Sequence, residues 1–333
     1  TSSWHGTHVA GTIAAVSNNS AGVAGVAYDA QVVPVRVLGR CGGTTADIAD
    51  GIIWASGGNV SGTTANNNPA DVINMSLGGQ GSCASTTQQA INIARGNGST
   101  VVIAAGNSND DSTNYNPGNC SGVVNVASTG RDGGRAYYSN YGNNVDVAAP
   151  GGAMQSASDP NGVLSTYNTG DTTPASDSYG FSQGTSMAAP HVAGVAALIK
   201  EADPSATPDD IASILASTTR SFPATCNGCG SGIVDASAAV QSALGGGSGG
   251  GSTNVLQNGI AETGLSGGVS SEQFFTFDVP SSATALSFTM AGGSGDADLY
   301  IRYGSQPTTQ TYDCRPYQSG NDEVCDISNV SVT

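Results

Sequence analysis

Residues 71–107, DVINMSLGGQGSCASTTQQAINIARGNGSTVVIAAGN, carry the pattern that decides the fold. The apolar run at 71–78 predicts a strand that ends in a glycine turn. Residues 86–98 predict an amphipathic helix with a glycine stop, and 101–107 predict a second, buried strand. Short apolar strands that alternate with helices are typical of a parallel sheet with helices on both faces. This stretch therefore predicts an α/β fold.

The same alternation continues in both directions over the first 244 residues. The further elements that we expect are a helix at 7–16, a buried strand at 31–38, a helix at 47–56, a buried strand at 123–129 and an apolar helix at 187–202. We therefore assign residues 1–244 to one α/β domain with three layers, a parallel sheet between two layers of helices.

The character of the sequence changes after residue 244. Residues 245–252, GGGSGGGS, are typical of a flexible linker, which spans roughly 15 Å for eight such residues. Beyond it, the segments 272–280, 285–292 and 296–304 alternate apolar and polar residues, as antiparallel strands do. We expect a partial antiparallel β-sandwich at 253–333, since these strands are too few to close a sandwich.

The charge of the chain narrows the choice of partners. Its 25 acidic and 9 basic residues give a net charge of −16, and Lys200 is the only lysine. Nucleic-acid binding depends on Lys and Arg, so we expect no nucleic-acid partner. No apolar run has the length of a membrane helix, so we also expect no membrane partner. We interpret the acidic residues as a solvated surface.

Seven cysteines are present, and they lack the paired CxxC motifs of a zinc finger. Disulfide bonds formed in an oxidising compartment are the better interpretation. Cys226-Asn-Gly-Cys229 is also compatible with a redox motif, but it lies in a polar, glycine-rich loop without a surrounding βαβ pattern. An odd number leaves one cysteine without a partner.

Ser186 lies in GTSMAAPH, residues 184–191, where a turn of small residues leads into the expected helix. Pro190 fits the first turn of that helix, where its missing N–H costs little. Ser186 would then lie at a helix N-terminus, where unpaired N–H groups and the helix dipole favour an oxyanion during acyl transfer. A capping serine is the alternative, which Ser186 alone does not exclude.

A serine nucleophile needs a base, and His5 is the candidate, at the start of the helix that begins HGTHVAGT. His8 follows three residues later, so a zinc pair is the rival interpretation. Zinc needs a third protein ligand, and HExxH is absent, so we reject it and expect His8 to be packed against the protein.

Asn107 ends the strand at 101–107, at the carboxyl end where α/β active sites lie. Its amide is suited to donate a hydrogen bond to an oxyanion, whereas a turn-forming asparagine is the common alternative.

Together these segments resemble the subtilase family of serine peptidases. HGTHVAGT at 5–12, SLGG at 76–79, AAGN at 104–107 and GTSMAAPHVAG at 184–194 occur in the order that the family has. The resemblance covers about residues 1–240 and is greatest to the extracellular alkaline subtilases of Gram-negative bacteria. Residues 253–333 resemble the bacterial pre-peptidase C-terminal domain.

The resemblance implies a secreted serine endopeptidase that forms an acyl-enzyme, with Ser186 as nucleophile, His5 as general base and then acid, and Asn107 as an oxyanion donor. It also implies broad specificity with an apolar or aromatic preference at P1, because the substrate pairs through its main chain. The substrate-binding residues that it implies are Gly42, Gly43, Ser76, Leu77 and Gly78 along the peptide, and Ala105 and Gly106 in the P1 pocket.

The sequence departs from the family pattern at one point. Subtilases carry the catalytic aspartate upstream of the histidine, and only Thr1, Ser2, Ser3 and Trp4 precede His5. We therefore expect that the chain is truncated at both ends, and that it is nearly inactive as it stands.

The resemblance further implies a structural Ca²⁺ site in the loop at 16–23, and no organic cofactor. The ligands that it implies are Asn19 and the carbonyl oxygens of Val16, Ala21 and Val23. A plain surface loop is an equal alternative.

We also predict the disulfides Cys83–Cys120, Cys226–Cys229 and Cys314–Cys325. Cys41 would then pair with a cysteine upstream of Thr1, or be free.

Two other functions remain open. A pseudoprotease would use the fold only for binding, but that role does not require His5, Asn107 and Ser186 together. The C-terminal domain would alternatively dock insoluble protein substrates through tyrosines, namely Tyr300, Tyr303, Tyr312 and Tyr317. We favour an extracellular, monomeric peptidase that acts on proteins and peptides.

Overall fold

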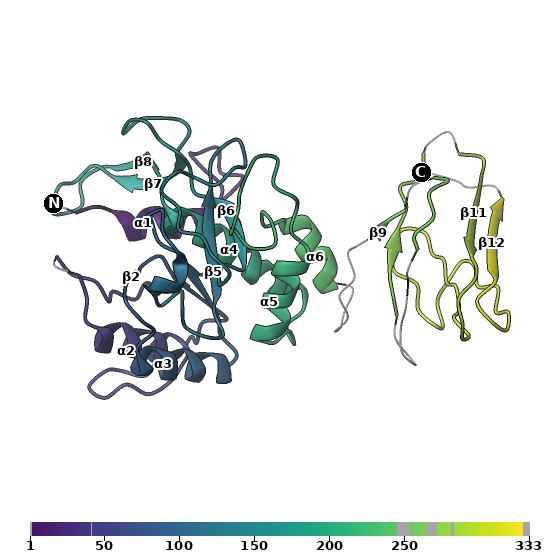
Figure 1. Ribbon diagram of the computed structural model, residues 1–333, viewed down its shortest axis with the longest axis horizontal. Helices are drawn as coiled ribbons and strands as arrows, with labels where there is room; N and C mark the ends of the chain where they lie inside the picture. Colours follow the sequence, from purple (N-terminus) through teal and green to yellow (C-terminus); the bar gives the residue numbers. More distant parts are fainter. Residues whose placement is uncertain are drawn as a thin grey trace. The chain divides into compact units, whose positions relative to one another are not determined.

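The computed structural model describes residues 2–40, 42–244, 254–256, 258–263, 265, 272–280 and 283–328. It divides into two compact units, Thr1–Thr253 and Asn254–Thr333 (Figure 1). The expected linker at 245–252, and Cys41 with its pairing, lie outside the described residues.

A parallel sheet forms the centre of the first unit, as the sequence predicts. Its strand order is β1 (Val72–Met75), β3 (Thr100–Ala104), β5 (Val124–Thr129) and β6 (Val147–Pro150). All three pairings are parallel. The carboxyl ends of the four strands therefore lie along one edge of the sheet.

Helices cover both faces of this sheet. Alternate residues of a strand point to opposite faces, so Val102 of β3 packs in one core cluster and Ile103 in another. The first cluster receives side chains from α4 (Thr185–Ala202), α5 (Pro208–Ser217) and α6 (Ala236–Leu244). The second receives them from α2 (Thr45–Ala55) and α3 (Ser85–Gly96), which lie together below the sheet in Figure 1. The predicted three-layer fold is confirmed.

The remaining elements of the first unit are a helix and two short antiparallel strand pairs. The helix α1 (His5–Ala14) packs against α4 and β7. The strands β7 (Val163–Asn168) and β8 (Asp177–Ser182) pair antiparallel, as do β2 (Gly79–Gln80) and β4 (Tyr115–Asn116), the latter preceded by the 3₁₀ turn Ser112–Asn114. Within the described ranges, no helix is long and apolar enough to cross a membrane.

The prediction of a buried strand at 31–38 is wrong. This segment belongs to no strand, and Val32, Val33 and Val35 are exposed. β1 is an edge strand of the sheet, and among the described residues no further strand pairs with its outer edge. Without a ladder to hold it against the sheet, the segment keeps its apolar side chains uncovered.

The predicted place of Pro190 is also wrong. Because α4 begins at Thr185, Pro190 is inside the helix rather than in its first turn. A proline lacks the N–H that would bond to the carbonyl four residues earlier. The carbonyl of Ser186 is thereby left free for another donor.

The second unit contains two small sheets. The strands β11 (Ala285–Met290) and β12 (Glu323–Ser328) pair antiparallel, as expected, whereas β9 (Asn254–Val255) and β10 (Phe275–Thr276) pair parallel. Phe277 and Phe288 pack edge to face, with ring centroids 5.9 Å apart. This arrangement gives the unit a small core between the segments.

The segment 296–304 was expected to form a strand, but within the described residues it has only an isolated bridge between Ile301 and Cys314. Its amides are bonded to side chains instead of a neighbouring strand. The amide of Leu299 donates to the Glu323 carboxylate, and that of Tyr303 donates to Asp313 over 2.7 Å. Side-chain acceptors therefore replace the ladder that the alternating pattern predicted.

The three predicted disulfides are present in the structure. Cys83–Cys120 joins the loop before α3 to the loop before β5, while Cys226–Cys229 and Cys314–Cys325 close short loops. The Cys226–Cys229 pair is thus bonded within a loop.

Candidate active site

Ser186 is the second residue of α4. The turn before it is held by Gly184, whose φ of 147° is in a region that glycine adopts readily and whose N–H donates to the Gly151 carbonyl over 3.0 Å. The Ser186 N–H has no acceptor in the described part of the chain, as expected for the first turn of a helix. Ser186 thus combines a hydroxyl with a free backbone donor.

Asn107 lies next to this turn. Its Oδ1 accepts hydrogen bonds from the N–H of Thr185 over 2.8 Å and from the Thr185 hydroxyl over 2.9 Å. These two bonds orient the amide, so Nδ2 is left as a donor. A Cβ built on Gly184 would lie 3.5 Å from Asn107 Nδ2 and 3.6 Å from the Ser186 nitrogen. Two unused N–H donors therefore lie close to the same point.

Ser76 connects β1 to the nucleophile candidate. Its hydroxyl donates to the Ser186 carbonyl over 2.8 Å, the acceptor that Pro190 leaves free. In turn, the Ser186 hydroxyl donates to the Ser76 carbonyl over 3.4 Å. Leu77 and Gly78 continue from Ser76 towards β2. The structure therefore brings Ser76, the first residue of the expected substrate-binding segment 76–78, together with Asn107 and Ser186 at the carboxyl edge of the sheet.

His5 is the first residue of α1, which packs along α4. Two pairs of neighbours give the direction of packing. His8 lies near enough to His191 for their charges to interact. Further along, the Thr12 carbonyl accepts from the N–H of Val26, whose side chain lies against Gly194 of α4. From the first pair to the second, the residue number increases in α1 and also in α4, so the two helices run in the same direction. Their first turns, which contain His5 and Ser186, therefore lie at the same end.

His5 has the protonation state that a base requires. The residue as a whole is exposed. The pKa of His5 is nevertheless lowered below its ordinary value, mainly by desolvation of the ring and to a smaller extent by repulsion from His8. The imidazole is therefore neutral at pH 7. Within the described residues no hydrogen bond joins His5 to Ser186, whose hydroxyl is bonded to Ser76 instead.

His8 is packed against the protein, as predicted. It is completely buried, and its Nε2 lies 2.9 Å from the Val163 carbonyl and 3.1 Å from the Gly180 carbonyl. These bonds fasten α1 to β7 and β8. Among the described residues no group of three or more His, Cys, Asp or Glu side chains is arranged to hold a metal ion.

Ala105 and Gly106 follow β3, and a residue that the sequence analysis missed holds them. Asn140 is completely buried; its Nδ2 donates to the Ala105 carbonyl over 3.0 Å, and its backbone N–H donates to the Gly106 carbonyl over 2.9 Å. Thr185 was also missed, although it lies inside the GTSMAAPH motif. No local signal distinguishes Asn140, because the partners of its side chain lie thirty or more residues away in the sequence.

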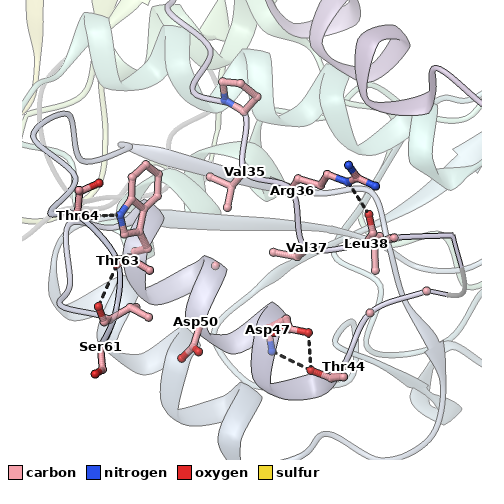
Figure 2. A pocket seen from close by; sticks show the side chains of 17 residues that line it. Val35, Arg36, Val37, Leu38, Thr44, Asp47, Asp50, Ser61, Thr63 and Thr64 are labelled. Carbon is pink, nitrogen blue, oxygen red and sulfur yellow. Dashed lines mark hydrogen bonds between the residues drawn. The ribbon is translucent and has the colours of Figure 1, made fainter. Parts of the chain in front are cut away.

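In the described residues, no hydrogen bond or strand pairing joins Gly42 and Gly43 to the Ser186 cluster. They line a separate hollow of about 1120 Å³ between the 34–39 segment and α2. Figure 2 shows Val35, Val37 and Leu38 along it, with Thr44 and Asp47 bonded at the start of α2. Neither His5 nor Ser186 lines this hollow, so it does not contain the proposed chemistry.

The 16–23 loop offers oxygen atoms without hydrogen-bond donors. In the part of the chain described, the carbonyls of Val16, Ala21 and Val23 accept no hydrogen bond, and the Ser17 hydroxyl is buried without a partner. Asn19 Oδ1 accepts from the Ala21 N–H over 3.1 Å and retains a second lone pair. This donor set fits a hard cation.

Comparisons with known proteins agree with these observations. Residues 1–247 match the model of the subtilase family, and residues 271–331 match that of the bacterial pre-peptidase C-terminal domain. An extracellular protease of Xanthomonas campestris is 55% identical over all of this chain and 56% of its own length. An extracellular basic protease of Dichelobacter nodosus is 51% identical over 73% of this chain and 40% of its own length.

One solved structure, described as proteases from Pseudoalteromonas arctica PAMC 21717, is similar as well. It is 79% identical, with a TM-score of 0.72, over 73% of this chain and 71% of that chain. The chain spans about half the length of the curated relatives. The family match covers most of the chain and includes the turn with Ser186 and the helix with His5, so the protein belongs to the subtilase family.

Proposed function

We propose that the protein is a secreted serine endopeptidase in which Ser186 is the nucleophile. The observation that carries this proposal is the pair of unused donors, the Ser186 N–H and Asn107 Nδ2, which lie 3.6 Å and 3.5 Å from the point where a Gly184 Cβ would be. Preorganised hydrogen-bond donors that face the developing oxyanion usually make the largest single contribution to stabilising the transition state of acyl transfer.

The proposed steps use only residues of this chain. His5 accepts the proton of the Ser186 hydroxyl as its oxygen attacks the peptide carbonyl, and the oxyanion is stabilised by the two donors. His5 then gives that proton to the leaving amine, which leaves an acyl-enzyme that water hydrolyses by the same route. The low pKa of His5 supports its role as base, because the ring is neutral before the attack.

Substrate is proposed to pair through its main chain with the backbone of residues 76–78. Ala105 and Gly106 would line the P1 pocket, with Asn140 holding them in place. The methyl group of Ala105 and the absence of a side chain at Gly106 support an apolar or aromatic P1 preference and broad specificity. Gly42 and Gly43 are proposed to add backbone groups to the same substrate-binding site.

The remaining assignments belong to the same proposal. The domains are 1–244 and 253–333, joined by 245–252, and the protein is an extracellular monomer that acts on proteins and peptides. Asn19 and the carbonyls of Val16, Ala21 and Val23 would hold Ca²⁺, which would supply rigidity to the loop after α1 and no catalytic step.

The test is labelling of the full-length gene product with a fluorophosphonate, a reagent that phosphonylates activated serines with loss of fluoride. We expect modification at Ser186 alone, with loss of casein hydrolysis, and no labelling of the S186A variant. Labelling of the gene product at another serine, with casein hydrolysis intact in S186A, would refute the proposal. An Asn107→Ala variant should label but turn over roughly 10²–10³ times more slowly.

A further inference from the structure

A second hollow, of about 670 Å³, opens at the carboxyl ends of β5 and β6. Thr129 is the last residue of β5, Pro150 is the last of β6, and both line the hollow. Neither Asn107 nor Ser186 is among its described lining residues. The carboxyl edge of a parallel sheet is where α/β proteins bind ligands. The hollow is therefore a candidate site distinct from the proposed active site.

The lining of this hollow is positively charged, although the protein is strongly acidic. Arg131 and Arg220 both line it, in a chain that has only 9 basic residues against 25 acidic ones. No Asp or Glu is among the described residues that line it. A concave surface with charges of one sign attracts ligands of the opposite sign. We call this hollow the Arg131–Arg220 pocket.

Arg220 has a fixed backbone and a free side chain. Its N–H donates to the Ile233 carbonyl over 2.9 Å, and its carbonyl accepts from the Ile233 N–H over 2.9 Å. Its guanidinium has neither a hydrogen bond nor an ion pair in the described part of the protein, whereas Arg95 and Arg315 pair with aspartates. Five N–H donors in a planar fork thus remain available for an anion.

Arg131 is oriented without being neutralised in an ion pair. One of its Nη atoms donates to the Pro160 carbonyl over 2.7 Å, and its other N–H groups form no hydrogen bond in the described residues. A carbonyl acceptor positions the guanidinium without an ion pair, although the Asp159 carboxylate lies near enough for the two charges to attract each other. The pocket therefore presents two cationic groups, one oriented by the protein and one free.

The nearby acidic side chains are occupied by backbone amides. Asp132 accepts from the N–H of Gly134 over 3.0 Å. Asp159 accepts from the N–H of Asn161 over 2.9 Å and from that of Gln155 over 2.7 Å. Both carboxylates thus close turns of their own loops. Neither forms an ion pair with a pocket arginine.

His191 connects the pocket to α4. It lines the hollow, and its Nδ1 bonds to the Met187 carbonyl over 2.8 Å, next to Ser186 in the sequence. Burial, and then repulsion from His8, lowers the pKa of His191, so the ring is neutral and offers an acceptor at Nε2. The positive charge of the pocket thus comes from its arginines.

We propose that the Arg131–Arg220 pocket binds a small oxyanion of the phosphate or carboxylate class between its two guanidinium groups. Planar guanidinium groups match the paired oxygens of both classes. The proposal does not depend on proteolytic activity, because the pocket and the proposed active site share no lining residue among Ser76, Asn107 and Ser186.

The test is calorimetric titration of the 333-residue protein with inorganic phosphate and, separately, with succinate, at an ionic strength held constant with sodium chloride. We expect saturable binding of at least one anion, and the preferred one identifies the class. Arg220→Gln and Arg131→Gln should each weaken binding at least about tenfold, because each removes charge-assisted hydrogen bonds. Arg220→Lys, which keeps the charge but loses the fork, should bind with intermediate affinity.

The matched control is Arg302→Gln, which removes an exposed arginine from the second unit. It should bind the anion as tightly as the unchanged protein. Circular dichroism of each variant establishes that it is folded, which is expected because Arg131 and Arg220 are both exposed. No binding of either anion by the unchanged protein, or equal binding by a folded Arg131→Gln, Arg220→Gln double variant, would overturn the proposal.

Discussion

The Ser76 hydroxyl donates a hydrogen bond of 2.8 Å to the carbonyl oxygen of Ser186, four residues before Pro190. An ordinary residue at 190 would bond to this carbonyl through its own N–H, and proline cannot. A residue at the end of β1 thus supplies the donor that α4 lacks. This bond ties the edge of the sheet to the turn that presents the proposed nucleophile.

Ser76→Ala should lower the free energy of unfolding by about 1–3 kcal/mol, since it leaves the Ser186 carbonyl without a donor. The measurement is urea unfolding followed by tryptophan fluorescence, because both tryptophans, Trp4 and Trp54, lie in the first unit. In a Pro190→Ala background the restored helical N–H can bond to that carbonyl. The same Ser76→Ala change should therefore cost less there.

Ser82→Ala is the matched control, because Ser82 is exposed and its hydroxyl has no hydrogen bond in the described residues. It should change stability by less than about 0.5 kcal/mol. If Ser76→Ala lowers the free energy of unfolding equally with Pro190 present and in the Pro190→Ala background, the N–H at position 190 does not replace the Ser76 hydroxyl as donor to the Ser186 carbonyl.

Thr185→Val should impair both stability and turnover. The Thr185 hydroxyl donates to Asn107 Oδ1 over 2.9 Å and accepts from the Gly106 N–H over 3.1 Å, and Thr185 is completely buried. Valine has nearly the same shape, so the loss of about 1–3 kcal/mol would reflect the hydroxyl alone. In the full-length gene product, kcat should fall more than KM changes, because a misoriented Asn107 affects the oxyanion. Thr185→Ser keeps the hydroxyl and should retain most of the turnover; an equal fall in kcat for both variants would argue against this role.

Gly194→Ala should destabilise the first unit, although alanine favours helices. A Cβ on Gly194 would lie 2.6 Å from Val26 Cβ, so the contact between α4 and the segment after α1 would have to open. Overpacking of this kind costs about 1–3 kcal/mol. Gly96→Ala, in α3, meets nothing within 4 Å and should stabilise the protein by roughly 0.5–1 kcal/mol. The two melting temperatures should therefore move in opposite directions, and a shift of the same sign would contradict the packing described.

Glu323→Gln should destabilise the second unit. The buried Glu323 carboxylate accepts from the N–H of Leu299 with one oxygen and from the N–H of Gln318 over 2.8 Å with the other. A glutamine would turn an NH₂ group towards one of these donors, at a cost of about 1–3 kcal/mol. Hydrogen exchange at the two amides is the measurement, and it should accelerate.

Glu272→Gln is the control for this change, because Glu272 is exposed. It removes the same charge without altering a buried bond. If it accelerates exchange at Leu299 and Gln318 as much as Glu323→Gln does, net charge rather than the buried carboxylate would be the cause.

Stability should fall as the pH is lowered from about 7 to about 5. Burial lowers the folded-state pKa of both His8 and His191 below the value near 6.5 of an unfolded histidine. Below that value the unfolded chain binds more protons than the folded one, so the free energy of unfolding decreases with falling pH. Urea unfolding at the two pH values gives the slope. His191→Asn should reduce the slope of the free energy of unfolding against pH. A slope unchanged by this variant would mean that His191 does not contribute to the pH dependence.

Much of the fold follows from local patterns in the sequence. The helices α2, α3 and α4 and the strands β1, β3 and β5 all overlap segments whose periodicity predicted them, and each begins within two residues of the predicted start. The segment 31–38 has the same apolar character and yet forms no strand, because a strand needs a partner as well as a pattern. Residues 296–304 have the alternating pattern of a strand, but two of their amides donate hydrogen bonds to side-chain carboxylates instead of to a neighbouring strand.

The kinds of residues that the site requires, and the elements that carry them, can be predicted from the sequence alone. The sequence placed Ser186 and His5 at the starts of helices and Asn107 at the end of a strand, because each of these positions depends only on neighbours along the chain. Tertiary structure alone decided which groups meet. The bond between Ser76 and Ser186, the support of Ala105 by Asn140 and the pocket between Arg131 and Arg220 join residues distant in sequence. Such contacts depend on how the helices and strands pack, and no local periodicity records them.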